Sequence, residues 1–125
     1  MVYEEAMPTT VLLVEDDGAM RLMCRVNLEL EGYRVLEADH LGRARELIGG
    51  ESIDVLLLDV HVRCEDGYDL VGLAREHGIP IALMTGSSKV GAPERELVDA
   101  VLSKPFRIEE LYSTVSRLAS ARVTR

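Results

Sequence analysis

Short apolar runs alternate with amphipathic segments along this 125-residue chain, and this alternation limits the fold more than any other feature of the sequence. A run of strand length followed by a segment with helical periodicity is the pattern of a β-strand and a crossover helix. The pattern occurs five times, and such crossovers place consecutive strands parallel in one sheet. The sequence therefore predicts an α/β domain in which helices cover both faces of a five-stranded parallel sheet.

The expected elements alternate strictly along the chain. The expected strands are residues 11–14, 33–38, 53–58, 79–85 and 101–103. The expected helices are residues 19–30, a segment that Asp39 caps and Gly49-Gly50 ends, residues 68–76, a short or irregular fourth helix within 93–98, and residues 108–121. On the first helix, one face is expected to carry Met20, Met23, Cys24, Asn27 and Leu30. Five such units suit the flavodoxin-like, doubly wound strand order 2-1-3-4-5.

The chain is expected to form one domain over residues 9–121, with an N-terminal extension (1–8) and a C-terminal tail (122–125). The formal net charge of −8 argues against direct nucleic-acid binding, which requires a basic surface. The first ten residues lack a signal-peptide pattern, and no apolar run approaches the ~20 residues of a membrane span. Cys24 and Cys64 lack metal-site spacing, so we expect reduced thiols. These features predict a cytoplasmic protein that binds neither nucleic acid nor a membrane.

Polar residues stand at the carboxyl ends of four predicted strands. Glu15 and Asp16 follow the first strand, Asp59 the third, Thr85 ends the fourth and Lys104 follows the fifth. These ends share one edge of a parallel sheet, so we expect the side chains to converge in one crevice. Clustered carboxylates repel one another, and Mg²⁺ or a lysine relieves that repulsion. A carboxylate beside Mg²⁺ is able to attack a phosphoryl group, and Asp59, after the central strand, is the best candidate nucleophile.

At this point the sequence resembles the receiver domain of response regulators in bacterial two-component signalling, of the chemotaxis-regulator-like kind. The resemblance rests on five motifs in the family's order: Leu12–Asp17, Leu56–Asp59, Asp66–Gly67 with Leu70 behind it, Met84–Gly86 and Ser103–Phe106. Each motif alone is weak, and together they are highly specific. They cover essentially residues 9–121.

The resemblance implies a role for each residue at the strand ends. Asp59 is the phosphoacceptor, Thr85 bonds a phosphoryl oxygen and Lys104 pairs with the phosphate. Mg²⁺, for which Mn²⁺ substitutes, is held by the carboxylates of Glu15, Asp16 and Asp59 and by the backbone carbonyl of His61. The implied phosphodonor is a sensor histidine kinase or a histidine phosphotransfer protein, and an unidentified downstream protein receives the signal. Family members also accept small phosphodonors and usually catalyse their own dephosphorylation.

Three features depart from the family's pattern. The pair after the phosphoacceptor region is usually Met-Pro and here is Val62–Arg63, so we expect a more mobile loop with an added cation near the site. The switch position that works with Thr85 is usually aromatic and here is Val101, which has no ring to swing inward. The segment between Thr85 and Lys104 is also short and loop-like. These departures indicate an altered signal output, whereas polar His61 and Ser87 indicate an ordinary phosphoryl lifetime.

Other interpretations of the same residues stay open. The acidic residues 15–17 also suit the start of a helix, where the macrodipole favours negative charge. An intact fold with an altered output face also suits a constitutive interaction module that does not use phosphorylation. A phosphohydrolase with an aspartate nucleophile is less favoured, because His61 stands where a second acid would be needed. Dimerisation through the last two helices is a further alternative.

Overall fold

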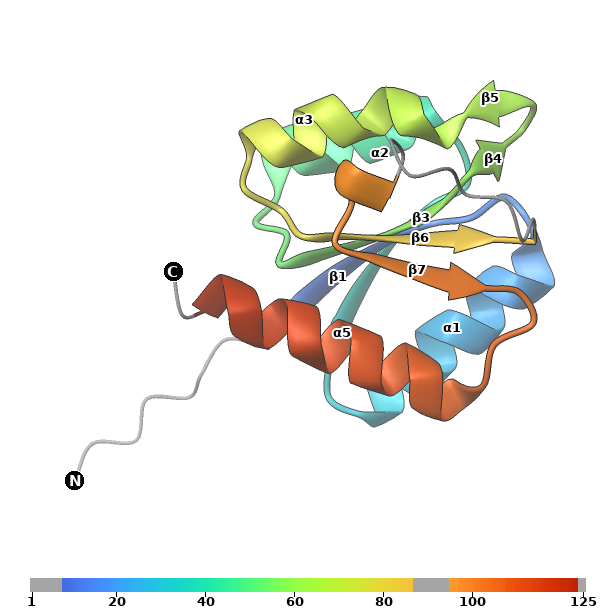
Figure 1. The fold of residues 1–125 in the computed structure, drawn as a ribbon, viewed down its shortest axis with the longest axis vertical. Coiled ribbons are helices and arrows are strands. Elements are labelled where there is room, and N and C mark those ends of the chain that lie inside the picture. Colours follow the sequence, from blue (N-terminus) through green and yellow to red (C-terminus); the bar gives the residue numbers. More distant parts are fainter. Residues whose placement is uncertain (1–7, 87–94, 124–125) are drawn as a thin grey trace.

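The computed structural model describes residues 8–86 and 95–123, and Figure 1 shows a parallel sheet between two layers of helices. The strand order of the sheet is β2-β1-β3-β6-β7. Its strands are β1 (Thr10–Val14), β2 (Arg34–Ala38), β3 (Val55–Asp59), β6 (Ile81–Thr85) and β7 (Ala100–Ser103). Since β4 and β5 form a separate two-stranded sheet, β6 and β7 are the fourth and fifth strands here. The predicted order 2-1-3-4-5 is therefore confirmed.

Helices cover both faces of the sheet, as the buried strands require. On one face lie α1 (Gly18–Leu30) and α5 (Ile108–Val123), and on the other lie α2 (Leu41–Gly50) and α3 (Val71–Glu76) (Figure 1). Alternate residues of β1 point to opposite faces: Leu12 and Val14 join the core beneath α2 and α3, whereas Val11 and Leu13 join the core beneath α1 and α5. The strand is apolar on both sides because both sides are covered.

Two predicted details of the helices are wrong. Asp39 does not cap α2, whose N-cap is His40 without a side-chain bond. The Asp39 carboxylate instead contacts the His40 ring and Arg63, at 2.7 Å each. Leu30 does not lie on the buried face of α1, because it is 76% exposed while Leu28 is fully buried. Leu30 follows Cys24 by six residues, roughly 240° around the helix, which places it away from the core.

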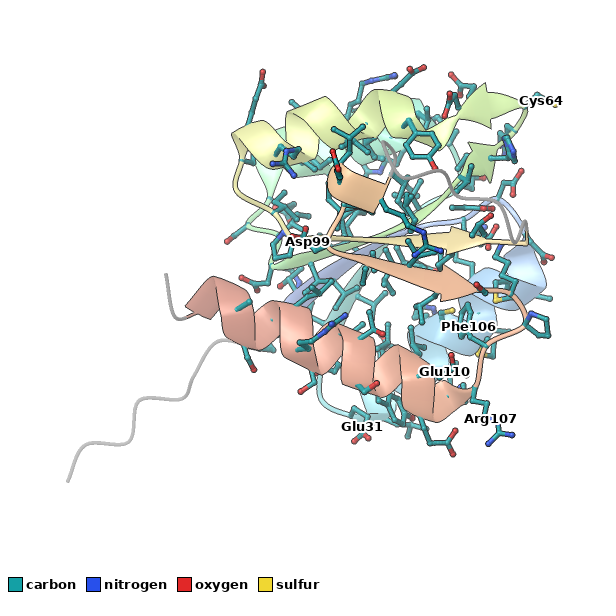
Figure 2. The ribbon with its side chains drawn as sticks, in the orientation of Figure 1. Glu31, Cys64, Asp99, Phe106, Arg107 and Glu110 are labelled. Carbon is teal, nitrogen blue, oxygen red and sulfur yellow. The ribbon has the colours of Figure 1, made fainter. Side chains whose placement is uncertain are left out.

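The segment after β3 differs from the expected loop. It forms an antiparallel hairpin of β4 (His61–Val62) and β5 (Glu65–Asp66), and a 3-10 turn, η1 (Gly67–Leu70), then leads into α3. Val62 is fully buried and anchors the hairpin to the core. Figure 2 shows Cys64 at the outer tip of this hairpin, where it is exposed.

Residues 93–94 of the fourth predicted helix lie outside the described residues, as does Ser87. Residues 95–96 have helical conformation and Leu97 forms a turn before β7. Among the described residues, no helix combines the length and apolarity needed to cross a bilayer.

Gly67 fixes how closely η1 approaches the end of β3. Its backbone N–H donates to the Val60 carbonyl at 2.7 Å. A Cβ atom on this glycine would lie only 2.2 Å from the carbonyl oxygen of Asp59, so no larger residue fits without a backbone shift. The packing of Gly67 therefore helps to determine where the chain leaves β3 at Asp59.

We expect Gly67→Ala to lower the free energy of unfolding by about 1–3 kcal/mol, because the added methyl group overpacks against backbone. The matched control is Gly72→Ala in α3, where a Cβ meets no atom within 4 Å. The control should raise the free energy of unfolding by about 0.5–1 kcal/mol, through helix propensity. Urea unfolding of both variants measures the difference, and equal effects would contradict the close approach at Gly67.

Candidate functional site

The parallel sheet brings the predicted site residues to one edge. Asp59 is the last residue of β3 and pairs in register with Met84 of β6, one residue before Thr85. Thr85 pairs with Ser103 of β7, and Lys104 follows directly. The backbone N–H of Lys104 donates to the Thr85 carbonyl at 2.7 Å, which extends the ladder by one bond. Glu15 continues β1, and its N–H donates to the Ala38 carbonyl at 3.0 Å.

Three carboxylates converge at this edge. Glu15, Asp16 and Asp59 each offer an oxygen, and these oxygens lie within 4.8 Å of one another. Glu15 is fully buried and Asp59 is 8% exposed, whereas Asp16 lies on the surface. The expected convergence of the carboxylates is therefore present in the structure.

Lys104 is the cation that faces the buried carboxylates. Its Nζ lies 2.7 Å from Glu15 Oε1 and 3.4 Å from Asp59 Oδ2. The peptide bond between Lys104 and Pro105 is cis. Burial of Lys104 acts to lower its pKa, but the hydrogen bond to Glu15 and the charge of Asp59 outweigh burial, and the pKa of Lys104 is raised. Lys104 therefore stays protonated at neutral pH.

One lysine does not fully compensate two buried carboxylates. Burial and the neighbouring Asp59 together raise the pKa of Glu15 to about 7, although the hydrogen bond from Lys104 acts in the opposite direction. Asp16 behaves differently, because a hydrogen bond from the Arg63 backbone N–H lowers its pKa. A carboxyl group with a raised pKa gains from any additional cation placed beside it.

The donor set fits a hard divalent cation. Oxygen ligands from a few carboxylates, on a site with one side open to water, suit Mg²⁺, which keeps several waters when bound. The exposed Asp16 places one carboxylate on the open side, while Glu15 and Asp59 lie deeper. The fourth predicted ligand is the backbone carbonyl of His61, a residue whose N–H donates to Asp59 Oδ1 at 3.4 Å. His61 is therefore adjacent to the cluster, and its role as a ligand stays a prediction.

The two predicted switch residues, Thr85 and Val101, are uncharged and lie on the neighbouring strands β6 and β7. Thr85 is 3% exposed at the end of β6. Val101, on the edge strand β7, is partly buried and packs against the core beneath α2 and α3. Its short aliphatic side chain thus belongs to the packing of that core.

Arg63 takes part in the site in a way that sequence reasoning missed. Its N–H donates to Asp16 Oδ2 at 2.8 Å, and its guanidinium contacts Asp39. The sequence indicated a cation near the site but gave no partner for it, because Asp39 was expected to cap a helix.

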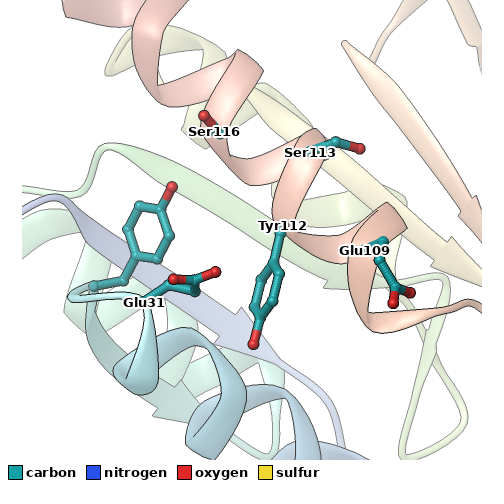
Figure 3. A pocket seen from close by; sticks show the side chains of 6 residues that line it. Glu31, Glu109, Tyr112, Ser113 and Ser116 are labelled. Carbon is teal, nitrogen blue, oxygen red and sulfur yellow. The ribbon is translucent and has the colours of Figure 1, made fainter.

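A separate groove of about 470 Å³ lies between the end of α1 and α5. Figure 3 shows its labelled residues Glu31, Glu109, Tyr112, Ser113 and Ser116, and Tyr33 also lines it. In Figure 2, Glu31 marks this region of the molecule. None of the predicted site residues lines this groove.

Comparison with known proteins agrees with the geometry. The model of the response regulator receiver domain family matches residues 11–116. The response regulator MprA of Mycolicibacterium vanbaalenii is 33% identical over 117 residues, which cover 90% of this chain and 51% of that protein. The transcriptional regulatory protein CpxR of Escherichia coli is 36% identical over 109 residues, which cover 84% of this chain and 47% of that protein. The chain thus spans about half the length of these curated relatives.

A solved structure gives a further comparison. The receiver domain of a sensor histidine kinase from Pseudomonas aeruginosa, described with a magnesium ion coordinated in its active-site cleft, is 27% identical. It superimposes with a TM-score of 0.80 over 91% of this chain and 99% of that one. From its match to the family model, its relatives and its fold, this chain belongs to the response regulator receiver domain family.

Proposed function

We propose that this chain is a phosphoacceptor switch, phosphorylated on Asp59 in a Mg²⁺-dependent reaction by a sensor histidine kinase or a histidine phosphotransfer protein. The observation that carries the proposal is the cluster of Glu15, Asp16 and Asp59 oxygens within 4.8 Å of one another, with Lys104 Nζ 3.4 Å from Asp59 Oδ2. This arrangement supports phosphoryl transfer to a carboxylate, because catalysis of that transfer depends on position and charge neutralisation.

The transfer forms one bond and breaks one. A carboxylate oxygen of Asp59 attacks the phosphorus of the phosphohistidine, and an acyl phosphate forms. The phosphorus–nitrogen bond breaks, and its electron pair goes to the ring nitrogen of the donor, which takes a proton from solvent. Lys104, protonated and beside Asp59, pairs with a phosphoryl oxygen. The Thr85 hydroxyl donates to another. In dephosphorylation, the oxygen of a water bonds to phosphorus, the phosphorus–oxygen bond to Asp59 breaks, and inorganic phosphate leaves with the carboxylate of Asp59 restored. We expect the domain itself to support this step.

Mg²⁺, or Mn²⁺ in its place, supplies neutralisation of the phosphoryl oxygens when bound. The residues that would hold it are Glu15, Asp16 and Asp59 through carboxylate oxygens and His61 through its backbone carbonyl. The raised pKa of Glu15, caused first by burial and then by Asp59, supports a need for this second cation beside Lys104.

The wider context is also part of the proposal. We place the domain boundaries at residues 9 and 121, the location in the cytoplasm, and the output in an unidentified downstream protein. We also propose that the signal output differs from the usual mode of the family. The observation that supports this is Val101, which packs on the core beneath α2 and α3 and has no ring to exchange between positions. Self-association through the last helices stays a subsidiary proposal.

Phosphorylation of Asp59 has a direct test. Incubation with Mg²⁺ and a small acyl phosphate should add one phosphoryl group to the intact protein, as seen by mass spectrometry. Asp59→Asn should abolish the addition, because an amide is not a nucleophile of this kind, and Asp69→Asn, on the exposed start of the next helical segment, should not. EDTA should prevent the reaction, and Mn²⁺ should restore it. A wild-type chain that stays unmodified would favour the constitutive interaction module instead.

The same substitution predicts a stability change without any phosphodonor. In metal-free buffer, Asp59→Asn should raise the free energy of unfolding by about 1 kcal/mol, because it removes a buried negative charge beside Glu15. Mg²⁺ should then stabilise the wild type more than the variant. Thermal unfolding with and without Mg²⁺ measures both effects, with Asp69→Asn as the control for loss of one surface charge. A destabilised variant would mean that Lys104 already compensates the cluster.

The switch proposal predicts where the phosphorylated state differs. Amide hydrogen exchange should change on β6 near Thr85 when beryllofluoride, a phosphoryl mimic, is bound with Mg²⁺. We expect little change at Val101, because a small side chain that already packs on the core has no alternative position to occupy. A large change in exchange at Val101, equal to that at Thr85, would show that the two residues are coupled in the way a ring would couple them.

A further inference from the structure

The turn of the β4–β5 hairpin holds two residues in an uncommon backbone conformation. Arg63 has φ 51° and Cys64 has φ 64°, and among the described residues these are the two non-glycine residues with positive φ. A two-residue hairpin turn of this handedness normally carries Asn and Gly, which reach the left-handed region with less strain. Strain of this kind persists where surrounding contacts hold it, and it concentrates at functional sites.

Arg63 supplies three such contacts. Its backbone N–H donates to Asp16 Oδ2 at 2.8 Å. Its guanidinium donates from Nε to the Asp39 carbonyl at 3.0 Å and from Nη2 to Asp39 Oδ2 at 2.7 Å. Asp39 follows β2, so Arg63 connects the hairpin, the end of β1 and the end of β2. We call the two guanidinium bonds to Asp39 the Arg63–Asp39 clamp.

We propose that Arg63 is a positioning residue, whose clamp to Asp39 holds the hairpin so that the Arg63 N–H fixes Asp16 for metal binding. This inference rests on the proposed function, since Asp16 matters there as a magnesium ligand. The Asp16 carboxylate is exposed, and without a fixed partner its side chain samples several rotamers. Partners that orient a metal ligand in this way typically change metal affinity when they are lost.

Because the clamp is exposed, its loss should affect the geometry of the site more than the stability of the fold. The side chains of Arg63 and Asp39 are 59% and 40% exposed. Exposed ion pairs contribute little to the stability of a protein, so loss of the clamp should leave the folded state intact. Its effect should appear where geometry matters, which is at Asp16.

The clamp and the charge of Arg63 predict opposite changes in Mg²⁺ affinity when Arg63 is replaced. A guanidinium near the acidic cluster repels an incoming cation, so charge alone predicts that Arg63→Ala binds Mg²⁺ more tightly. The clamp predicts the reverse, because Asp16 loses its fixed orientation. Arg63→Lys keeps the charge but loses the fork of the guanidinium, so it should also bind Mg²⁺ more weakly than the wild type.

The test is an Mg²⁺ titration followed by NMR of the backbone amides. Arg63→Ala should weaken apparent Mg²⁺ affinity about tenfold, at the low end of the range for residues that orient metal ligands. Asp39→Ala should weaken it comparably, and the double variant should be no worse than either, because both remove one interaction. Arg45→Ala, an exposed arginine on α2, is the control and should bind as the wild type does.

A second readout needs no metal. The Arg63 amide should exchange with solvent faster in Asp39→Ala than in the wild type, because its bond to Asp16 loosens, while melting temperatures stay close. Unchanged or tighter Mg²⁺ binding by Arg63→Ala, or an unchanged Arg63 amide in Asp39→Ala, would overturn the clamp. A wild type that binds no Mg²⁺ would overturn the proposed function and the inference together, and is distinguishable because every variant would then behave alike.

Discussion

Two buried carboxylates beside one lysine are the interaction on which the rest of this structure depends. Glu15 is fully buried and Asp59 nearly so, and Lys104 Nζ reaches both, at 2.7 and 3.4 Å. Burying such charges costs free energy that a single ammonium only partly returns, as the pKa of Glu15, raised to about 7 mainly by burial, indicates. The fold therefore holds a cluster of negative charge, whose cost in free energy is offset by the packing of the apolar core and would be reduced by a further cation.

The parallel sheet is what makes such a cluster attainable. Residues 15, 59 and 104 are far apart in the chain, yet the ends of β1, β3 and β7 lie along one edge of the sheet. Apolar residues of both cores hold these strands from each side, so the charged residues need only follow the last buried position of their strand. Gly67, packed against the Asp59 carbonyl, then fixes the direction in which the chain leaves the site.

The features with a strong periodic signal were predictable from the sequence. The five parallel strands, their order and the convergence of Glu15, Asp59 and Lys104 follow from apolar runs and from the shared edge of parallel strands. One error arose where a side chain had a choice of partners. Asp39 suits a helix cap locally, but Arg63, distant in sequence, takes its carboxylate. The hairpin with Arg63 at its turn was missed because neither residue of the turn is the Asn or Gly that normally signals one.

The central claim is that one divalent cation binds among Glu15, Asp16 and Asp59, and paramagnetic Mn²⁺ tests it most directly. Added in small amounts to isotope-labelled protein, Mn²⁺ broadens the NMR signals of nuclei near its binding site. The account predicts that the amides of Asp16, Asp59 and His61 broaden first, while those lining the acidic groove at Glu31 and Glu109 stay sharp. Broadening that spreads equally over the exposed acidic residues, or that begins at the groove, would contradict it.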